Sequence, residues 1–329
     1  MQGKLSASAG RLTIWHNPMR KHSLLPLLLC LALTLLSACG GRQPKALPPA
    51  SSFPYPEPPA MVTDATQRAE YAVLRWWNKY FEAPQRYSEE MTEQAFVNYI
   101  TVLPMVSLPV MERAQDSLLT KAERSEAARD TAARVLERIL SLEEKYLYDV
   151  NSPYRNEEFY LPVMRHILAW PDIRDDVRIR TQREYPLFSL NRLGTVAADF
   201  TYTLRYGRTG TLHSIKADRI LMFFSNPGCQ NCKEIIDALS SSPAVQAQLQ
   251  DGSLKVLNVY PDEDLSEWFA YMSHYPKNWI NGFDAEGIIR GDSIYLLRAI
   301  PSLYLLDSEK RVICKDAPLE EILRRLERE

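Results

Sequence analysis

Five cysteines are the residues of this 329-residue chain whose type and spacing could do chemistry: Cys30, Cys39, Cys229, Cys232 and Cys314. Only Cys229 and Cys232 are separated by two residues, in a C-x-x-C pattern. One turn of chain across that spacing brings the two sulfurs within bonding distance, so a disulfide can form and open between them. The pair therefore predicts thiol-disulfide exchange, with Cys229 as the attacking residue and Cys232 as the residue that resolves a mixed disulfide.

The segments on either side of the pair explain why Cys229 would attack. A continuous apolar run from Arg219 to Ser225 predicts a buried strand, and a helix is predicted from Cys232 to Leu239. Cys229 would then lie beside the unpaired backbone N–H groups of the helix N-terminus, which favour a thiolate over a thiol. Neighbouring Lys233 adds positive charge that would stabilise the thiolate further.

Three other uses of the pair compete with exchange. A zinc site would need two more ligands, but the chain has no second C-x-x-C, and His213 and His274 stand alone in the sequence. A purely structural disulfide across so short a loop would add little stability, because the entropic gain grows with loop length. A peroxidase that uses a single cysteine is the remaining alternative.

The sequence from Leu193 onwards predicts the elements that position the pair. Strands and helices alternate along it, which predicts an α/β fold with a central mixed sheet and flanking helices. The further predicted elements are a strand at Asp199–Leu204, a turn at 206–210, a strand at Leu254–Tyr260, a helix from Asp264 to about Ser273, a short helix near Asp292–Leu297, a hairpin of Ser302–Leu306 with Arg311–Cys314, and a helix at Pro318–Arg328.

The segment from Gly194 to Glu329 resembles the TlpA/ResA-type branch of the thioredoxin-like superfamily. Gly194–Phe200 is similar to the opening motif of that branch, Leu221–Phe224 to its central strand, Cys229–Cys232 to its redox pair, and Ala299–Asp307 to the segment that presents a cis-proline. The resemblance implies a thioredoxin-like fold and protein-disulfide substrates. It also implies that Pro301, preceded by Ile300, has a cis peptide bond, borders the substrate groove and blocks metal capture by the dithiol.

The chain departs from that family around the pair, so the sequence sets no value for its redox potential. Residues 226–228 are Asn-Pro-Gly where relatives commonly carry a tryptophan, and Gln230-Asn231 replaces a proline-containing dipeptide. About 30 mV of potential corresponds to roughly 1.4 kcal/mol, which one or two hydrogen bonds supply. Asn226 also stands where peroxiredoxins usually carry a threonine, so peroxidase activity ranks second.

The acid that assists proton transfer in thioredoxin has no equivalent at the same place. Phe223 occupies the strand region in which thioredoxin keeps that buried acid. Asp262, Glu263 and Asp264 are candidates by position, although three acids in a row are more typical of a solvated helix start. Cys314, in the last predicted hairpin, is expected to be a small buried core residue rather than a third redox partner.

The region from Asp64 to about Tyr185 predicts an all-α domain of five or six helices. Prolines and polar turns predict breaks at Pro84, around Pro104 and Pro109, at 151–153, at 170–171 and at Pro186. Aromatic residues at helical spacing favour a core over a ligand groove. The region is similar to an uncharacterised helical domain that precedes thioredoxin-like modules in envelope lipoproteins of Gram-negative bacteria. We therefore predict an all-α domain at 63–188 and a thioredoxin-like domain at 189–329.

Residues 1–38 have the features of a bacterial lipoprotein signal. A basic segment, Met19-Arg20-Lys21-His22, precedes a short apolar run from Leu24 to Leu36. Leu36-Ser37-Ala38-Cys39 then resembles the lipobox, in which the cysteine is acylated. The alternative is an uncleaved anchor helix, for which the run is short. A proline-rich stretch at 39–62 predicts an extended tether. Lipidation of Cys39 would anchor the protein in the cell envelope, facing the periplasm, where disulfide chemistry is possible.

The composition narrows the expected partners. A formal net charge of -2, with acids and bases interspersed, argues against nucleic-acid binding. The expected partners are protein disulfides and an upstream envelope reductant, with no cofactor and no metal. A different class of hypothesis makes the cysteine pair vestigial and the helical domain a binding or assembly module.

Overall fold

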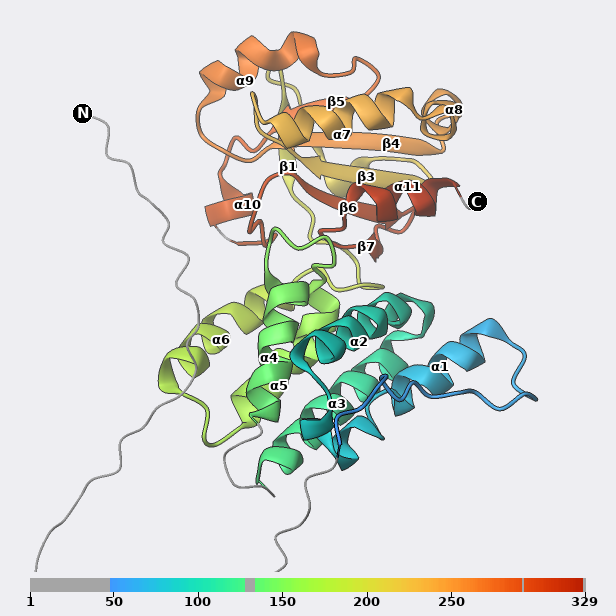
Figure 1. Ribbon diagram of the computed structural model, residues 1–329. Coiled ribbons are helices and arrows are strands. Elements are labelled where there is room, and N and C mark those ends of the chain that lie inside the picture. The colour runs from blue at the N-terminus through green and yellow to red at the C-terminus, as the bar shows by residue number, and fades with distance from the viewer. Residues whose placement is uncertain (1–47, 128–133, 292, 328–329) are drawn as a thin grey trace, which may run out of the picture.

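The computed structural model describes residues 48–127, 134–291 and 293–327 (Figure 1). Within these ranges, six α-helices come first along the chain, and the strands of one seven-stranded sheet follow. We call residues 65–188 the helical half and residues 201–327 the sheet half. The predicted signal segment with Cys30, the predicted lipidation site Cys39, and residues 39–47 of the predicted tether lie outside the described residues.

Polar side chains cap several of the helix starts in the helical half. Asp64, Ser88 and Asn156 accept hydrogen bonds from backbone N–H groups at the N-termini of α1, α2 and α5. The predicted break at Pro186 is wrong, because α6 continues for two residues beyond it; a proline in the last turn removes only one backbone hydrogen bond. The helices are α1 (Ala65–Arg75), α2 (Glu89–Val102), α3 (Leu108–Ala127), α4 (Val135–Glu143), α5 (Glu157–Ala169) and α6 (Asp175–Phe188), with 3-10 turns at Tyr80–Glu82, Pro84–Arg86 and Leu103–Met105 and a π turn at Glu144–Tyr148.

Aromatic side chains form much of the core of the helical half, as their spacing predicts. Trp76, Trp77, Phe96 and Tyr99 are buried. Their rings contact one another mainly in tilted and edge-to-face arrangements, such as Trp77 with Tyr99 at a centroid distance of 5.8 Å. This geometry is the favoured one for aromatic pairs, and it leaves no ligand groove between these side chains.

The first described residues pack onto this core and do not form a free tether. Phe53 is 6% exposed, and its ring contacts the rings of Trp77, Tyr80 and Tyr87. Burial of one such ring contributes about 2 kcal/mol, enough to hold an extended segment against the helices. The prediction of an extended spacer is therefore wrong for the segment around Phe53.

The sheet half is built on a mixed sheet with the strand order β2-β1-β5-β4-β3-β6-β7. β3 pairs in parallel with β4, and β4 with β5, whereas β3 pairs antiparallel with β6. The mixed sheet agrees with the predicted architecture. The strands are β1 (Thr201–Leu204), β2 (Thr209–Thr211), β3 (Arg219–Phe224), β4 (Leu254–Tyr260), β5 (Ile280–Phe283), β6 (Ser302–Asp307) and β7 (Val312–Cys314).

Helices cover both faces of this sheet. Side chains of α7, α8, α9 and α11 form one core with Leu221 and Phe223 of β3. On the other face, Ile220, Met222 and Phe224 pack with α10 and with loop residues. The helices are α7 (Gln230–Ser241), α8 (Pro243–Asp251), α9 (Leu265–Tyr271), α10 (Ile288–Gly291) and α11 (Leu319–Glu327), with 3-10 turns at Leu212–Ser214 and Met272–His274.

Several parts of the sheet half differ from the sequence prediction. Neither α8 nor β5 is predicted, and β2 begins at Thr209, inside the predicted turn at 206–210. The short helix predicted near 292–297 is wrong, because the helix here is α10, earlier in the chain, and Ser293 adopts a φ of 52° that a right-handed helix does not allow. Residues 293–301 form a loop that leads into β6.

The helical half lies beside the β7 edge of the sheet (Figure 1). Lys315, directly after β7, donates hydrogen bonds to the carbonyl oxygens of Phe188 and Leu190, each at 2.6 Å. The two halves are therefore joined through buried polar contacts. None of the helices in the described ranges combines the length and the apolar character that crossing a membrane requires.

Candidate active site at the cysteine pair

Cys229 lies at the junction between β3 and α7, as the sequence predicts. It is the N-cap residue of α7, and the backbone N–H of Cys232 donates to its Sγ at 3.1 Å. Gly228 precedes it with a φ of 71°, a conformation that favours glycine and turns the chain into the helix. In a reduced protein, a thiolate at Cys229 would therefore be stabilised by backbone N–H groups and by the positive end of the helix dipole.

The two cysteines form a disulfide and differ in their exposure. The bond joins Cys229 to Cys232 with their Cα atoms 5.2 Å apart. Cys232 is 2% exposed, whereas Cys229 is half-buried and is flanked by exposed Gly228 and Gln230. An incoming sulfur can therefore approach Cys229 but not Cys232. This asymmetry matches the predicted division into an attacking and a resolving cysteine.

Pro301 lies close to the pair in the topology of the sheet. The Ile300–Pro301 peptide bond is cis, which confirms the conformation that the resemblance implied. The register of β3 with β6 pairs Phe224 with Ser302, so Pro301 continues alongside the segment that leads to Cys229. Ile300 and Cys229 both pack at the margin of the same apolar core. The structure thus brings four of the predicted site residues, Cys229, Cys232, Ile300 and Pro301, to one end of the sheet.

Lys233, whose positive charge is expected to stabilise the Cys229 thiolate, pairs with a carboxylate on its own helix. Its Nζ donates to Asp237 Oδ2 at 2.5 Å, across one turn of α7. The hydrogen bond that it donates to Asp237 raises the pKa of this lysine. The stabilisation of a Cys229 thiolate by Lys233 stays a prediction, and the lysine shares its charge with an exposed carboxylate one turn further along α7.

The acidic residues after β4 perform structural tasks. Asp264 caps α9 by accepting from the backbone N–H groups of Ser266 and Glu267. The hydrogen bond from Ser266 lowers the pKa of Asp264. Asp262 accepts from Asn226 Nδ2 at 2.9 Å and pairs with Arg290 Nε at 2.9 Å. Asp264 fits the solvated helix start that a run of three acids predicts, and Asp262 fixes the asparagine three residues before Cys229.

The sheet below the pair holds neutral polar groups near Phe223, the position at which thioredoxin keeps a buried acid. Phe223 is fully buried and packs edge-on against Trp279. Ser225 Oγ donates to Asn258 Oδ1 at 2.5 Å, and Asn258 Nδ2 donates to Asn281 Oδ1 at 3.0 Å. Ser225 and Asn258 are both fully buried. Two polar residues inside otherwise apolar strands are the signal that could have identified this network from the sequence.

Tyr275 packs against this network. It is 3% exposed and lies against Ser225 and Asn258, and its burial raises the pKa of the phenol. The hydroxyl therefore stays protonated near neutral pH. Hydrogen bonds link Ser225, Asn258 and Asn281, whereas the Tyr275 hydroxyl is buried without a hydrogen bond to them.

Cys314 is separate from the redox pair. It is a free, buried cysteine in β7, and burial raises the pKa of its thiol to about 12. This confirms the prediction of a core residue, because a thiol with such a pKa is not a nucleophile near neutral pH. Among the described residues, no group of three or more His, Cys, Asp or Glu side chains could hold a metal ion.

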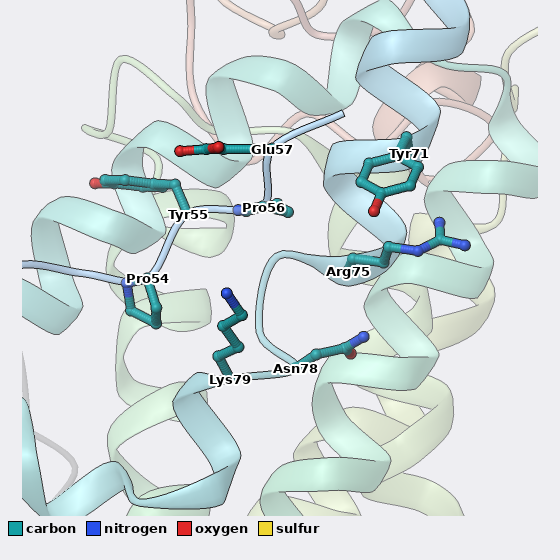
Figure 2. Close-up of a pocket in the computed structure, with 8 residues that line it drawn as sticks. All are labelled: Pro54, Tyr55, Pro56, Glu57, Tyr71, Arg75, Asn78 and Lys79. Atoms are coloured by element: carbon teal, nitrogen blue, oxygen red, sulfur yellow. The ribbon is translucent and has the colours of Figure 1, made fainter. Parts of the chain in front are cut away.

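Two cavities lie away from the cysteine pair. A cavity of about 640 Å³ opens between the halves, with walls from α3, α5 and α11 and with Cys314 in its lining. Figure 2 shows a smaller pocket of about 350 Å³ on the helical half, between the proline-rich segment and α1. It is lined by Pro54, Tyr55, Pro56, Glu57, Tyr71, Arg75, Asn78 and Lys79.

Comparisons with known proteins place the chain among its relatives. A family model described as a domain of unknown function (DUF5106) matches residues 37–191. Among curated proteins, none matches. The crystal structure of a thioredoxin-like protein from Bacteroides caccae is 38% identical, with a TM-score of 0.71, and the match covers 84% of this chain and 98% of that one.

Two further solved structures match the chain over a shorter stretch. The C-terminal domain of an uncharacterized protein from Bacteroides fragilis is 47% identical, with a TM-score of 0.41, over 41% of this chain and 97% of that one. The thioredoxin domain of a thiol-disulfide oxidoreductase from Bacteroides vulgatus is 19% identical, with a TM-score of 0.36, over 41% of this chain and 96% of that one. The match to the Bacteroides caccae protein, in contrast, extends beyond the length of the sheet half.

Proposed function

The chain belongs to the thioredoxin-like proteins, and from this membership we propose that it is a thiol-disulfide oxidoreductase of the cell envelope. One observation carries the proposal: Cys229 is a half-buried N-cap residue in a disulfide with buried Cys232. Cis-Pro301 directly precedes the neighbouring strand β6. A purely structural disulfide needs neither this asymmetry nor a helix N-terminus behind one sulfur.

The proposed reaction begins with the reduced pair. The Cys229 thiolate attacks one sulfur of a client disulfide, which breaks that bond, forms a mixed disulfide and releases a client thiolate that takes up a proton. Cys232 then loses its proton and attacks Cys229 Sγ, which releases the second client thiol. The client gains two electrons, and the pair ends as the disulfide seen here. A dithiol reductant in the envelope must return two electrons before the next cycle.

The remaining site residues would bind the client protein and take no part in electron transfer. Pro301 and Ile300 would border the groove in which an extended client segment lies beside Cys229. The helical region at 63–188 would form an all-α domain that selects or orients clients for the thioredoxin-like domain at 189–329. A TlpA/ResA-type relationship would suit this arrangement, and reduction is the proposed direction.

The proposed location follows from the sequence before residue 48. A signal segment at 1–38 and acylation of Cys39 would hold the protein on an envelope membrane, facing the periplasm. Its partners there would be protein disulfides and the upstream reductant, with no nucleic acid and no cofactor. An oxidising compartment is where such exchange has clients.

Trapping of clients tests the proposal. A Cys232→Ser variant lacks the resolving sulfur, so we expect it to accumulate mixed disulfides on Cys229 that are visible on non-reducing gels of periplasmic extracts. The wild type should reduce the insulin disulfide with dithiothreitol as the electron source. A Cys229→Ser variant is the matched control and should do neither.

Two outcomes would sink the proposal. One is a Cys232→Ser variant that forms no mixed disulfides, together with a wild type that leaves insulin oxidised, as expected for a vestigial pair. The other is turnover of hydrogen peroxide that needs Cys229 alone and persists in Cys232→Ser, as expected for a peroxidase.

A further inference from the structure

The loop that carries cis-Pro301 is tied to the helical half through Arg298. This arginine lies three residues before the proline, and its side chain is 12% exposed. Its Nε donates to Glu157 Oε1 at 3.1 Å, and its Nη1 donates to the carbonyl oxygen of Tyr148. The guanidinium also lies over the rings of Tyr148 and Phe188, with its carbon 5.1 and 4.9 Å from their centroids. Every one of these partners belongs to the helical half.

A second tie begins on the other side of the proline. Ser302 Oγ donates to Asp316 Oδ1 at 2.7 Å. Asp316 Oδ2 in turn pairs with Arg155 Nε of the helical half at 3.4 Å. Residues 298 and 302 thus flank Pro301, and both connect to the short stretch of the helical half between residues 148 and 157.

Glu157 is the centre of the junction. It is 2% exposed, at the first position of α5, and its two oxygens meet Arg298 and Lys315, the latter at 3.0 Å. A buried carboxylate between two cations is stable only while both cations stay in place, because removal of either leaves uncompensated charge. The junction therefore favours one position of the loop relative to α5.

We propose that Arg298 is a positioning residue for Pro301, so that the helical half sets the shape of the client groove. The proposal rests on the proposed function, because it gives Pro301 a client to bind. Residues 293–301 form no helix or strand that would fix the proline independently. Docking of the helical half beside the sheet would not by itself require contacts to the residues on both sides of Pro301.

The test compares a large and a small disulfide substrate in the full-length protein. Positioning of Pro301 matters for insulin, whose chain must lie in the groove, and much less for a small aromatic disulfide. We expect Arg298→Ala to raise KM for insulin about tenfold, and to lower the insulin-to-small-disulfide ratio of kcat/KM by a similar factor. Arg298→Lys should recover only part of this loss, because an ammonium lacks the planar stacking and the fork of donors.

Arg180→Ala is the matched control. Arg180 also lies over the Tyr148 ring, at 5.3 Å, but it pairs with Glu144 at 3.1 Å within the helical half. For Arg180→Ala, we expect the insulin-to-small-disulfide ratio of kcat/KM to stay within about twofold of the wild-type ratio. If Arg180→Ala and Arg298→Ala changed that ratio equally, Arg298 would contribute only to packing, and the inference would be wrong.

The outcomes separate this inference from the proposed function. Wild type that reduces neither substrate contradicts the function itself. Active wild type beside a folded Arg298→Ala protein with an unchanged insulin KM contradicts the positioning role alone. Should Arg298→Ala fail to fold, Ser302→Ala removes only one hydroxyl from the second tie and should raise the insulin KM about twofold to threefold. An unchanged KM in that variant also counts against the inference.

Discussion

The two halves of the molecule differ in how they place buried carboxylates. In the helical half, three carboxylates are at most 2% exposed, Glu143, Glu157 and Glu158, and the last two pair with cations at the junction with the sheet half. The sheet half buries Asp284, which accepts from the backbone N–H of Ile289 in α10. Other carboxylates near the cysteine pair cap a helix or pair at the surface.

This difference separates the charges that hold the fold together from the group that reacts. Buried ion pairs stabilise only the arrangement that keeps them complete, so they suit a junction between two halves. Exchange at Cys229 needs a thiolate, and the backbone N–H groups at the N-terminus of α7 would stabilise it. The helical half is thus expected to act on the site through position rather than through its electric field.

Loss of Glu158 is the largest test of this comparison. Its carboxylate accepts from Arg192 Nη2 at 2.7 Å and from the backbone N–H of Leu193 at 3.0 Å, where the chain leaves the helical half. We expect Glu158→Ala to lower the free energy of unfolding by about 2–3 kcal/mol, because the Leu193 N–H and the Arg192 guanidinium lose a buried, charged acceptor. Denaturant unfolding followed by circular dichroism measures this loss.

A surface pair provides the control for that experiment. Glu309 pairs with Arg311 at 3.1 Å, and the two side chains are 72% and 49% exposed. Glu309→Ala should change the free energy of unfolding by less than about 1 kcal/mol, because water screens the pair. An equal decrease in the free energy of unfolding in Glu158→Ala and Glu309→Ala would show that the Glu158 contacts stabilise the fold no more than a surface ion pair does.

Glu143 gives a smaller effect that depends on pH. Burial raises its pKa from 4.5 to about 8, and a hydrogen bond from Gln115 offsets part of the rise. The folded protein keeps this proton while the unfolded chain releases it, so stability falls as pH rises from about 4.5 to 8. Glu143→Gln removes the titration, and we expect it to be more stable than wild type at pH 8 by on the order of 2 kcal/mol, with the gain vanishing toward pH 5.

Glu93→Gln distinguishes this effect from general pH dependence. The hydrogen bond from Lys145 lowers the pKa of Glu93, so the stability that it contributes is present above the unfolded pKa and is lost only in acid. Between pH 5 and 8 the difference between Glu93→Gln and wild type should therefore be flat. A flat difference for Glu143→Gln as well would contradict a buried, protonated Glu143.

Local patterns in the sequence were sufficient for much of the sheet half. The strand predicted at Leu254–Tyr260 coincides with β4, because a long apolar run leaves few alternatives. The C-x-x-C spacing specifies the N-cap position of Cys229, since both cysteines and the helix start lie within four residues. The ion pair of Lys233 with Asp237 could also be predicted from the sequence, because residues four apart meet on a helix.

Features that depend on distant contacts were not predictable in this way. Ser225 and Asn258 meet only because β3 and β4 pair in one register, and nothing local specifies that register. β5 was missed because Asn281 and Gly282 interrupt its short apolar pattern. The proline-rich composition around Phe53 predicts a tether, and the ring contacts that hold it come from residues more than twenty positions later in the chain.

Asp264 offers the smallest and most specific test, because it separates capping from proton transfer next to the pair. Its carboxylate accepts from Ser266 and Glu267 at the start of α9, and a side-chain amide can accept these bonds as well. We expect Asp264→Ala to lower Tm by about 2–3 °C, and Asp264→Asn to leave Tm and the insulin reduction rate near wild type. A thermal melt and a rate measurement on each variant distinguish the two roles. If Asp264→Asn keeps its Tm but loses activity, the carboxylate moves protons, and the sheet half uses an acid after all.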